Sequence, residues 1–430
     1  MASGLGGILA VRLLGLALVV GAVLCAARAG RLLGGARGSV LAAATCAALV
    51  SDPLLGTREV DAETVGLPIV MLASVLALEA VRRPRGRQRA GLLVASGAAG
   101  AAALLVKQNL ADGLVFAVAM TALAALTGKA PRREPLADVA WVVFGAVLPC
   151  AAVSVWAAAT SGAPALWYSL YGFRIAASAS LFTGSSVAQA TRIHGLAMAA
   201  LLSGLASLIA AAAWVAVSRG RHDATSVALL AMLATEILGV AGGGYYWTHY
   251  LIGLIPATCL LVGRACAHAV RARLLIGLVV SSLLLSVAQV AVAATRTATP
   301  AGGEVGTLTA WLTRSERPRD SAVVLYGEAA LFDTTRLRPA YPFLWTLPQR
   351  VLDPHLNRLV RTLDRSDRPT YVVVRSSLDP WAQDPHGRVR RALERHYTLA
   401  AHVCTDSVYL RRGTTRATPP GTPCPTAAAS

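Results

Sequence analysis

The stretch from residue 51 to residue 63 concentrates acidic side chains just before an apolar segment. It reads Ser-Asp-Pro-Leu-Leu-Gly-Thr-Arg-Glu-Val-Asp-Ala-Glu and holds four carboxylates and one arginine, Arg58. Ionisable groups beside a membrane-spanning segment are costly to bury, so they mark candidate functional positions. A carboxylate in such a place can act as a general base. We therefore take Asp61 and Glu63, which adjoin the apolar segment, as candidate catalytic residues; the simpler alternative is that these carboxylates are only solvated.

Three basic residues are candidates for binding a phosphate group or a lipid headgroup. Arg12 lies near one end of the first apolar segment, Lys107 lies at a turn between two others, and Arg174 lies in a long loop rich in aromatic residues. Basic side chains hold phosphate oxygens through charge-assisted hydrogen bonds. The simpler alternative for Lys107 is a side chain that only extends its ammonium group to the membrane surface.

The segment at 242–250 combines aromatic rings with a histidine and reads Gly-Gly-Gly-Tyr-Tyr-Trp-Thr-His-Tyr. Tyr245, His249 and Tyr250, together with Arg58, are candidates for lining a sugar or acceptor pocket, because aromatic side chains present a broad face on which a sugar can stack. Aromatic residues at a membrane surface also form belts without further function. Glu236 lies inside an apolar segment, where a carboxylate needs a partner or a wet cavity.

Long apolar segments must position these groups. Of the 430 residues, 55% are hydrophobic and 14% are charged, and the mean hydropathy is +0.57. Soluble domains carry about 25% charged residues. The composition therefore excludes a disordered chain and an ordinary soluble enzyme and indicates an integral membrane protein in a lipid bilayer. The net charge of +18 comes mostly from short loops between apolar runs, so we expect no nucleic-acid partner.

The apolar segments predict about ten transmembrane helices: 8–27, 38–51, 63–80, 91–106, 111–127, 138–160, 195–217, 225–241, 249–264 and 274–294. One alternate set of loops holds 16 Lys and Arg residues and the other set holds 4. The positive-inside rule assigns the richer set to the cytoplasm. All candidate groups, and the C-terminal region, are then expected on the extracytoplasmic side of the plasma membrane.

The C-terminal region changes character and predicts a small α/β domain at 295–412, after a transmembrane domain at 1–294 and before a disordered tail at 413–430. The expected strands are 321–327, 370–375 and 407–412. The expected helices are 304–314, 353–365 and 384–397, the last two opened by Asp N-caps. Cys404 and Cys424 form a disulfide if this domain is extracytoplasmic, or are two unpaired thiols.

Several motifs together resemble one family. The Arg58–Glu63 stretch entering a Pro-containing apolar segment, followed by Gly-Ala-Ala-Gly-Ala-Ala-Ala-Leu-Leu-Val-Lys at 97–107, resembles the protein mannosyltransferase / aminoarabinose transferase-like family of membrane glycosyltransferases. Tyr-Trp-Thr-His-Tyr-Leu-Ile-Gly-Leu-Ile-Pro at 246–256 is similar to the His-Tyr…Pro signature of its actinobacterial members. The strand at 323–327 and Tyr-Pro-Phe-Leu-Trp at 341–345 are similar to their extracytoplasmic tail.

The resemblance spans nearly the whole chain and implies a GT-C fold, a polytopic α-helical bundle with an extracytoplasmic active site. It also implies inverting transfer of a mannose- or arabinose-type sugar from a polyprenyl-phosphate donor to a glycan, lipid or protein acceptor. Members of the family carry a further first span followed by a loop with the catalytic Asp or Glu. No Asp or Glu precedes Asp52 here, so we expect a span missing upstream.

Two alternatives stay open from the sequence. The first is a non-catalytic or truncated GT-C-like membrane protein that binds glycolipid. The second is a lipid or glycolipid transporter, although transporters commonly show paired repeats and charges at the midplane of the membrane. No cofactor is expected, and no carboxylate pattern in the sequence demands a metal, although a divalent metal stays open.

Overall fold

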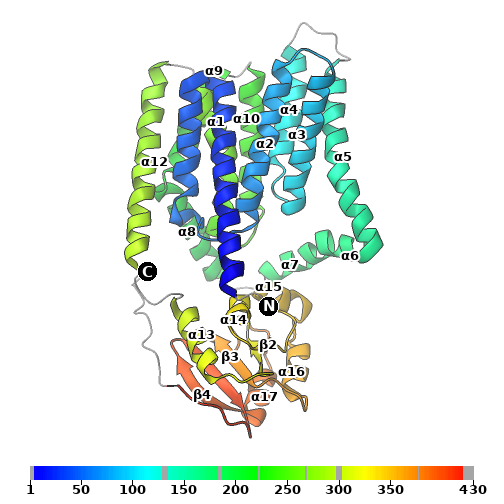
Figure 1. Ribbon diagram of the computed structural model, residues 1–430, viewed down its shortest axis with the longest axis vertical. Helices are drawn as coiled ribbons and strands as arrows, with labels where there is room; N and C mark the ends of the chain where they lie inside the picture. The colour runs from blue at the N-terminus through cyan, green and yellow to red at the C-terminus, as the bar shows by residue number, and fades with distance from the viewer. Residues whose placement is uncertain are drawn as a thin grey trace. The chain divides into compact units, whose positions relative to one another are not determined.

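The computed structural model describes residues 4–127, 134–182, 186–220, 223–266, 269–296, 303–375 and 377–419 (Figure 1). The chain separates into two compact units, each with its own internal contacts. The helical unit comprises Leu5–Trp167 and Ser186–Ala293. The second unit comprises Met1–Gly4, Tyr168–Ser185 and Ala294–Ser430, and it contains the sheet.

The helical unit begins with α1 (Gly4–Val50), which is a hairpin of two helices. Gly34 and Gly35 leave the helical backbone, and Gly35 has φ +68°, a conformation that favours glycine. Ser39 Oγ donates to the carbonyl oxygen of Ala27 at 2.9 Å. Twelve residues of straight helix would separate these atoms by about 18 Å. The two apolar segments expected at 8–27 and 38–51 are therefore the two arms of this hairpin.

The remaining elements of the helical unit are also almost all helical. They are η1 (Pro53–Leu55), α2 (Ala62–Arg82), α3 (Arg87–Val106), α4 (Asp112–Thr127), α5 (Glu134–Thr160), α6 (Ala163–Trp167), α8 (Ser186–Leu202), α9 (Leu205–Gly220), α10 (Ala224–Ala241), η3 (Thr248–Leu254), α11 (Ile255–Ala265) and α12 (Ala269–Arg296).

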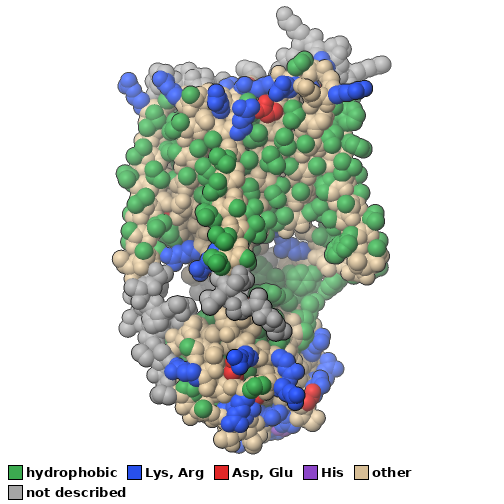
Figure 2. Space-filling model, viewed as in Figure 1, with side chains coloured by type: hydrophobic (Ala, Val, Ile, Leu, Met, Phe, Trp, Pro, Cys, Tyr) green, Lys and Arg blue, Asp and Glu red, His purple; other side chains and the backbone are tan. Residues whose placement is uncertain are grey.

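Seven helices in the described part of the chain are long and apolar enough to cross a membrane, or up to eight if α8 and α9, bent by 68°, form one span. This is fewer than the ten apolar segments that we expected, because α1 contains two of them and the apolar part of α4 is short. Hydrophobic side chains cover the middle of the helical unit, and Lys and Arg gather at its upper end in Figure 2. The protein is therefore a multi-pass membrane protein.

Small residues bring the helices of this unit into backbone contact. A Cβ atom on Gly97 of α3 would lie 1.9 Å from the carbonyl oxygen of Val142 in α5, and one on Gly145 of α5 would lie 2.0 Å from that of Val94 in α3. Such close approach lets van der Waals packing replace the hydrophobic driving force that lipid does not provide.

The second unit contains a five-stranded sheet in the order β2-β1-β3-β5-β4. The strands are β1 (Ser321–Val324), β2 (Arg338–Pro339), β3 (Tyr371–Arg375), β4 (Tyr397–Val403) and β5 (Asp406–Arg411). β1 is parallel to β2 and β3, whereas β5 is antiparallel to β3 and β4. The helices of this unit are η2 (Tyr168–Gly172), α7 (Phe173–Phe182), α13 (Gly303–Ser315), α14 (Ala329–Thr334), α15 (Thr346–Leu352), α16 (Asn357–Asp364) and α17 (Arg388–His396).

Both faces of this sheet are covered by helices. Trp311 of α13 and Val373 of β3 belong to one buried cluster, and Leu363 of α16, Leu393 of α17 and Val372 of β3 belong to the other. Consecutive residues of β3 therefore contribute to opposite faces, as the pleat of a strand requires. The alternation explains why β3 is buried almost throughout.

Part of the secondary structure of this domain was predicted, but β2, α14 and α15 were not, and the helix expected at 353–365 begins only at Asn357, with Leu356 rather than Asp353 as its N-cap. The three expected strands correspond to β1, β3 and β5. Asp384 does receive the first backbone N–H groups of α17, from Arg388 at 2.7 Å and Val389 at 2.9 Å, although Gly387 is the capping residue by position. β4 was missed, and its first residue, Tyr397, was expected to end the helix at 384–397.

The start of the C-terminal tail differs from the disorder that we expected. The carboxylate of Asp320 binds the guanidinium of Arg416 through two hydrogen bonds, of 2.6 and 2.9 Å. Ser315 Oγ donates to the carbonyl oxygen of Ala417 at 2.7 Å, and Trp311 Nε1 donates to that of Pro419 at 3.1 Å. Residues 413–419 are therefore docked on the domain, and residues 420–430 lie outside the described residues.

Candidate functional site

The first turn of α2 holds Asp61 in a fixed orientation. Asp61 is the N-cap, and its Oδ1 accepts hydrogen bonds from Thr64 N at 2.8 Å and Thr64 Oγ1 at 2.9 Å. This is the normal way in which an Asp satisfies the free N–H groups at a helix start. The second oxygen, Oδ2, is buried and has no hydrogen-bond partner in the described chain. One oxygen thus fixes the side chain, and the other is available to a ligand or a proton.

Glu63, two residues further on, forms a buried ion pair with Lys107. Its side chain is 1% exposed, and its Oε1 contacts the Nζ atom of Lys107, the residue at which α3 ends. The ammonium group of Lys107 also lies 4.4 Å from the centroid of the Tyr250 ring, a cation–π distance. The other oxygen of Glu63 is buried and unpaired within the described residues. Lys107 therefore does more than reach the membrane surface.

His249 enters from η3 and faces Asp61. Its Nδ1 lies 3.8 Å from Asp61 Oδ2, which is an ion-pair distance and too long for a hydrogen bond. Its ring meets that of Tyr250 edge to face, with 5.0 Å between centroids. Gly56, with φ +73°, ends η1 directly against it, because a Cβ on Gly56 would lie 2.9 Å from the His249 Cβ. Gly56 thus sets how closely the acidic loop approaches the histidine.

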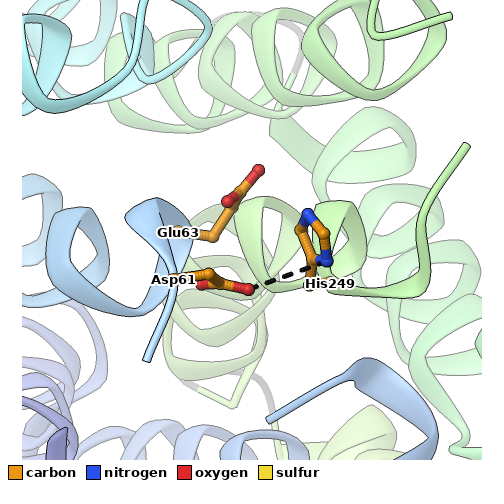
Figure 3. Close-up of side chains that lie close together, drawn as sticks. All are labelled: Asp61, Glu63 and His249. Carbon is orange, nitrogen blue, oxygen red and sulfur yellow. Dashed lines mark ion pairs between the residues drawn. The ribbon is translucent and has the colours of Figure 1, made fainter. Parts of the chain in front are cut away.

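Asp61, Glu63 and His249 together form a candidate cation site (Figure 3). Each offers one ligand atom, and these atoms lie within 4.8 Å of one another. Two carboxylates and an imidazole suit a divalent ion such as Zn²⁺ or Mn²⁺ and leave open positions for substrate. Lys107 already neutralises Glu63, so an ion held by all three ligands would have to displace or share that contact.

The other predicted site residues of the helical unit have no described contact with this cluster. The hydroxyl of Tyr245 is buried and has no hydrogen-bond partner among the described residues. Arg12 and Arg58 are exposed. The helix carrying Arg12 does pass close to the acidic loop, because a Cβ on Gly15 would lie 2.6 Å from a methyl carbon of Val60.

Arg174 belongs to the other compact unit. It lies in α7, where its side chain is exposed. Its predicted role in phosphate binding therefore has no geometric support from the cluster in the helical unit.

Glu236 has the partner that its apolar surroundings require. It is 3% exposed, and its Oε1 accepts the backbone N–H of Ala257 at 2.9 Å. Its other oxygen, Oε2, and both carboxylate oxygens of Asp112, which is 1% exposed at the start of α4, are buried without a hydrogen-bond partner among the described residues.

Two residues with positioning roles were missed in the sequence. Thr64 is part of an Asp-x-x-Thr pattern, which is a recognisable N-cap signal. Gly56 follows Pro53-Leu54-Leu55, a pattern typical of a short turn that ends on glycine. Neither signal identified a site, because both are common in proteins.

Comparisons of this chain with protein-family models, with curated proteins and with solved structures find no match. A function must therefore be argued from the cluster and from the architecture that positions it.

Proposed function

We propose that this protein is a membrane glycosyltransferase of the GT-C type. It would move a mannose- or arabinose-type sugar from a polyprenyl-phosphate donor to an extracytoplasmic glycan, lipid or protein acceptor. The observation that carries this proposal is the cluster of Asp61, Glu63, Lys107 and His249 at one end of an apolar helical bundle. It combines an available carboxylate, basic groups and an aromatic ring where a lipid-linked phosphate would meet water.

The chemistry divides naturally among these groups. An acceptor hydroxyl attacks the anomeric carbon, the bond from that carbon to the phosphate oxygen breaks, and its electron pair leaves with the lipid phosphate. Asp61 Oδ2, which no hydrogen bond occupies, takes the proton of the hydroxyl. Lys107 and the imidazole of His249 stabilise the charge that develops on the leaving phosphate. The transition state resembles an oxocarbenium ion, so the carboxylate of Glu63 also stabilises it.

A divalent cation fits the same chemistry. Asp61, Glu63 and His249 would hold it, and when bound it would supply positive charge for the leaving phosphate. In that case the carboxylates act mainly as ligands, and Lys107 is released from Glu63 to face the phosphate. Transfer in the presence of a chelator distinguishes this arrangement from the metal-free one.

The architecture supports the proposed topology. Eight of the ten expected apolar segments each match one described helix or one arm of α1, whereas 195–217 is divided between α8 and α9 and 249–264 between η3 and α11. The basic loops lie at the ends of these helices away from the cluster, which favours an extracytoplasmic cluster. Cys404 is disulfide-bonded, which supports an oxidising compartment for the sheet domain; Cys424, its expected partner, lies outside the described residues.

The test is transfer of labelled sugar from polyprenyl-phosphate donors by the full chain, reconstituted in lipid. Asp61→Asn and Lys107→Met should each lower kcat/KM by about 100-fold or more. Glu59→Gln, an exposed acid in the same loop, is the matched control and should retain activity. Unchanged transfer in both cluster variants would refute the assignment. If the wild-type protein binds the donors and transfers none, it is a glycolipid-binding protein instead.

A further inference from the structure

A second cluster of charge lies in the sheet domain, unrelated to the proposed transferase site. A cavity of about 590 Å³ opens at the end of the sheet where β1, β2 and β3 begin and β5 ends. Six arginines line it: Arg319, Arg338, Arg365, Arg368, Arg411 and Arg416. We call it the arginine pocket. Basic side chains are frequent on the visible face of this domain in Figure 2.

The charge of the arginine pocket is only partly neutralised. Asp320 binds Arg416 and Asp367 binds Arg365, at 2.6 and 2.8 Å. The other four arginines have no acidic partner among the described residues. Packing so many guanidinium groups together costs electrostatic energy that an anion would relieve.

Three of these four arginines, Arg338, Arg368 and Arg411, are nevertheless held in place by hydrogen bonds. Arg338 donates to the carbonyl oxygen of Arg319 at 3.0 Å, Arg368 to that of Arg365 at 2.7 Å, and Arg411 to that of Arg368 at 3.3 Å. Backbone carbonyls orient a guanidinium without cancelling its charge. Each of these side chains keeps further N–H donors for a ligand, because a guanidinium has five.

We propose that the arginine pocket binds a phosphate-bearing anion. A guanidinium presents a planar pair of donors that matches two phosphate oxygens, and several such forks converge here. The volume lies within the range of ligand sites, roughly 300–1,000 Å³, and has room for more than one phosphate group. Four uncompensated charges suit a diphosphate. The source is a free phosphate compound or the headgroup of an anionic lipid, and both present the same chemistry.

The first experiment measures binding of inorganic pyrophosphate to the full chain in an uncharged detergent by calorimetry at low salt. The double variant Arg338→Gln/Arg368→Gln should weaken binding by about tenfold or more, since each charge-assisted hydrogen bond contributes more than a neutral one. The matched control, Arg361→Gln/Arg391→Gln, removes two exposed arginines of α16 and α17 outside the pocket and should change affinity less than twofold.

A parallel arm counts lipids bound to the same variants by native mass spectrometry in mixed micelles of phosphatidylglycerol or phosphatidylcholine. Selective loss of phosphatidylglycerol from the pocket variant assigns the site to a lipid headgroup, and selective loss of pyrophosphate assigns it to a free phosphate compound. The proposal is overturned if the pocket variant and the control behave alike in both arms.

A variant that should bind more tightly separates loss of the site from misfolding, because a misfolded protein would not gain affinity. Asp367→Asn removes the exposed acid that competes for Arg365. It should tighten binding by about two- to fivefold, the range for an exposed ion pair. Unchanged or weaker binding in both arms would contradict the proposal.

Discussion

Removing the ammonium group of Lys107 should leave Glu63 as an uncompensated buried charge. The Glu63 side chain is 1% exposed, whereas the Lys107 side chain is 21% exposed. Breaking a buried ion pair from one side costs about 3–5 kcal/mol, and the partial exposure of Lys107 puts this pair near the lower limit. Loss of the contact with the Tyr250 ring adds about 0.5–1 kcal/mol. Lys107→Met should therefore lower the free energy of unfolding by about 3–4 kcal/mol.

A double-mutant cycle separates this pair from general packing effects. Because Lys107→Met/Glu63→Gln leaves no unpaired charge, its cost should fall short of the sum of the single variants by about 2 kcal/mol. Unfolding is followed by loss of helical circular dichroism as sodium dodecyl sulfate is added to the protein in mild detergent. The matched cycle at Arg28 and Glu79, whose arginine side chain is 51% exposed, should give a coupling below about 1 kcal/mol. Additive costs at Lys107 and Glu63 would refute the buried pair.

Three further changes test other parts of the structure. Gly56→Ala places a Cβ 2.9 Å from that of His249 at φ +73°, so it should displace His249. Sugar transfer should then fall by more than the fraction of unfolded protein seen in thermal melts explains. A fall in transfer that matches the unfolded fraction would contradict this. Gly97→Val forces α3 away from a backbone carbonyl of α5, and its yield of folded protein on size-exclusion chromatography should fall well below that of Gly97→Ala. Burial raises the pKa of Asp320, but hydrogen bonds from Arg416 outweigh this and lower it below 3.8, so tail docking should be complete above about pH 4 and weaken as the pH falls through the lowered pKa. Hydrogen exchange should report this, and Asp320→Asn should abolish the pH dependence.

The membrane-spanning architecture could be predicted because lipid imposes a simple rule on the sequence. Each crossing needs a long apolar run, and the runs at 63–80 and 274–294 fall inside α2 and α12. The break between α8 and α9 could not be predicted in the same way, because the apolar run at 195–217 continues through the bend of 68° that separates these helices.

The pairing of site residues could not be predicted from residue types. Lys107 was expected to bind phosphate, and the structure pairs it with Glu63. The sequence shows that a charged residue lies near a membrane surface. It does not show which residue that side chain contacts, because the contact depends on how helix ends from distant parts of the chain pack together. Arg12 and Arg58 show the same limit, because both are exposed and neither has a described contact with the cluster.

The edge strand β4 was missed for a different physical reason. Only its two ends are buried, at Tyr397 and Val403, and the residues between them are exposed or half-buried. An edge strand contributes little to the core, so its sequence carries a weak hydrophobic pattern. β3, which is paired on both sides, was predicted easily because almost all of it is buried.

The sheet order also has a consequence for biosynthesis. β3 lies between β1 and β5, and β5 is synthesised after β1 to β4. Until β5 is synthesised, one edge of β3 is unpaired. The indole N–H of Trp311 also lacks its acceptor until Pro419 is synthesised. The sheet can therefore be completed only after β5 has been synthesised, and a nascent chain stalled before residue 406 would expose a hydrophobic strand edge to chaperones and proteases.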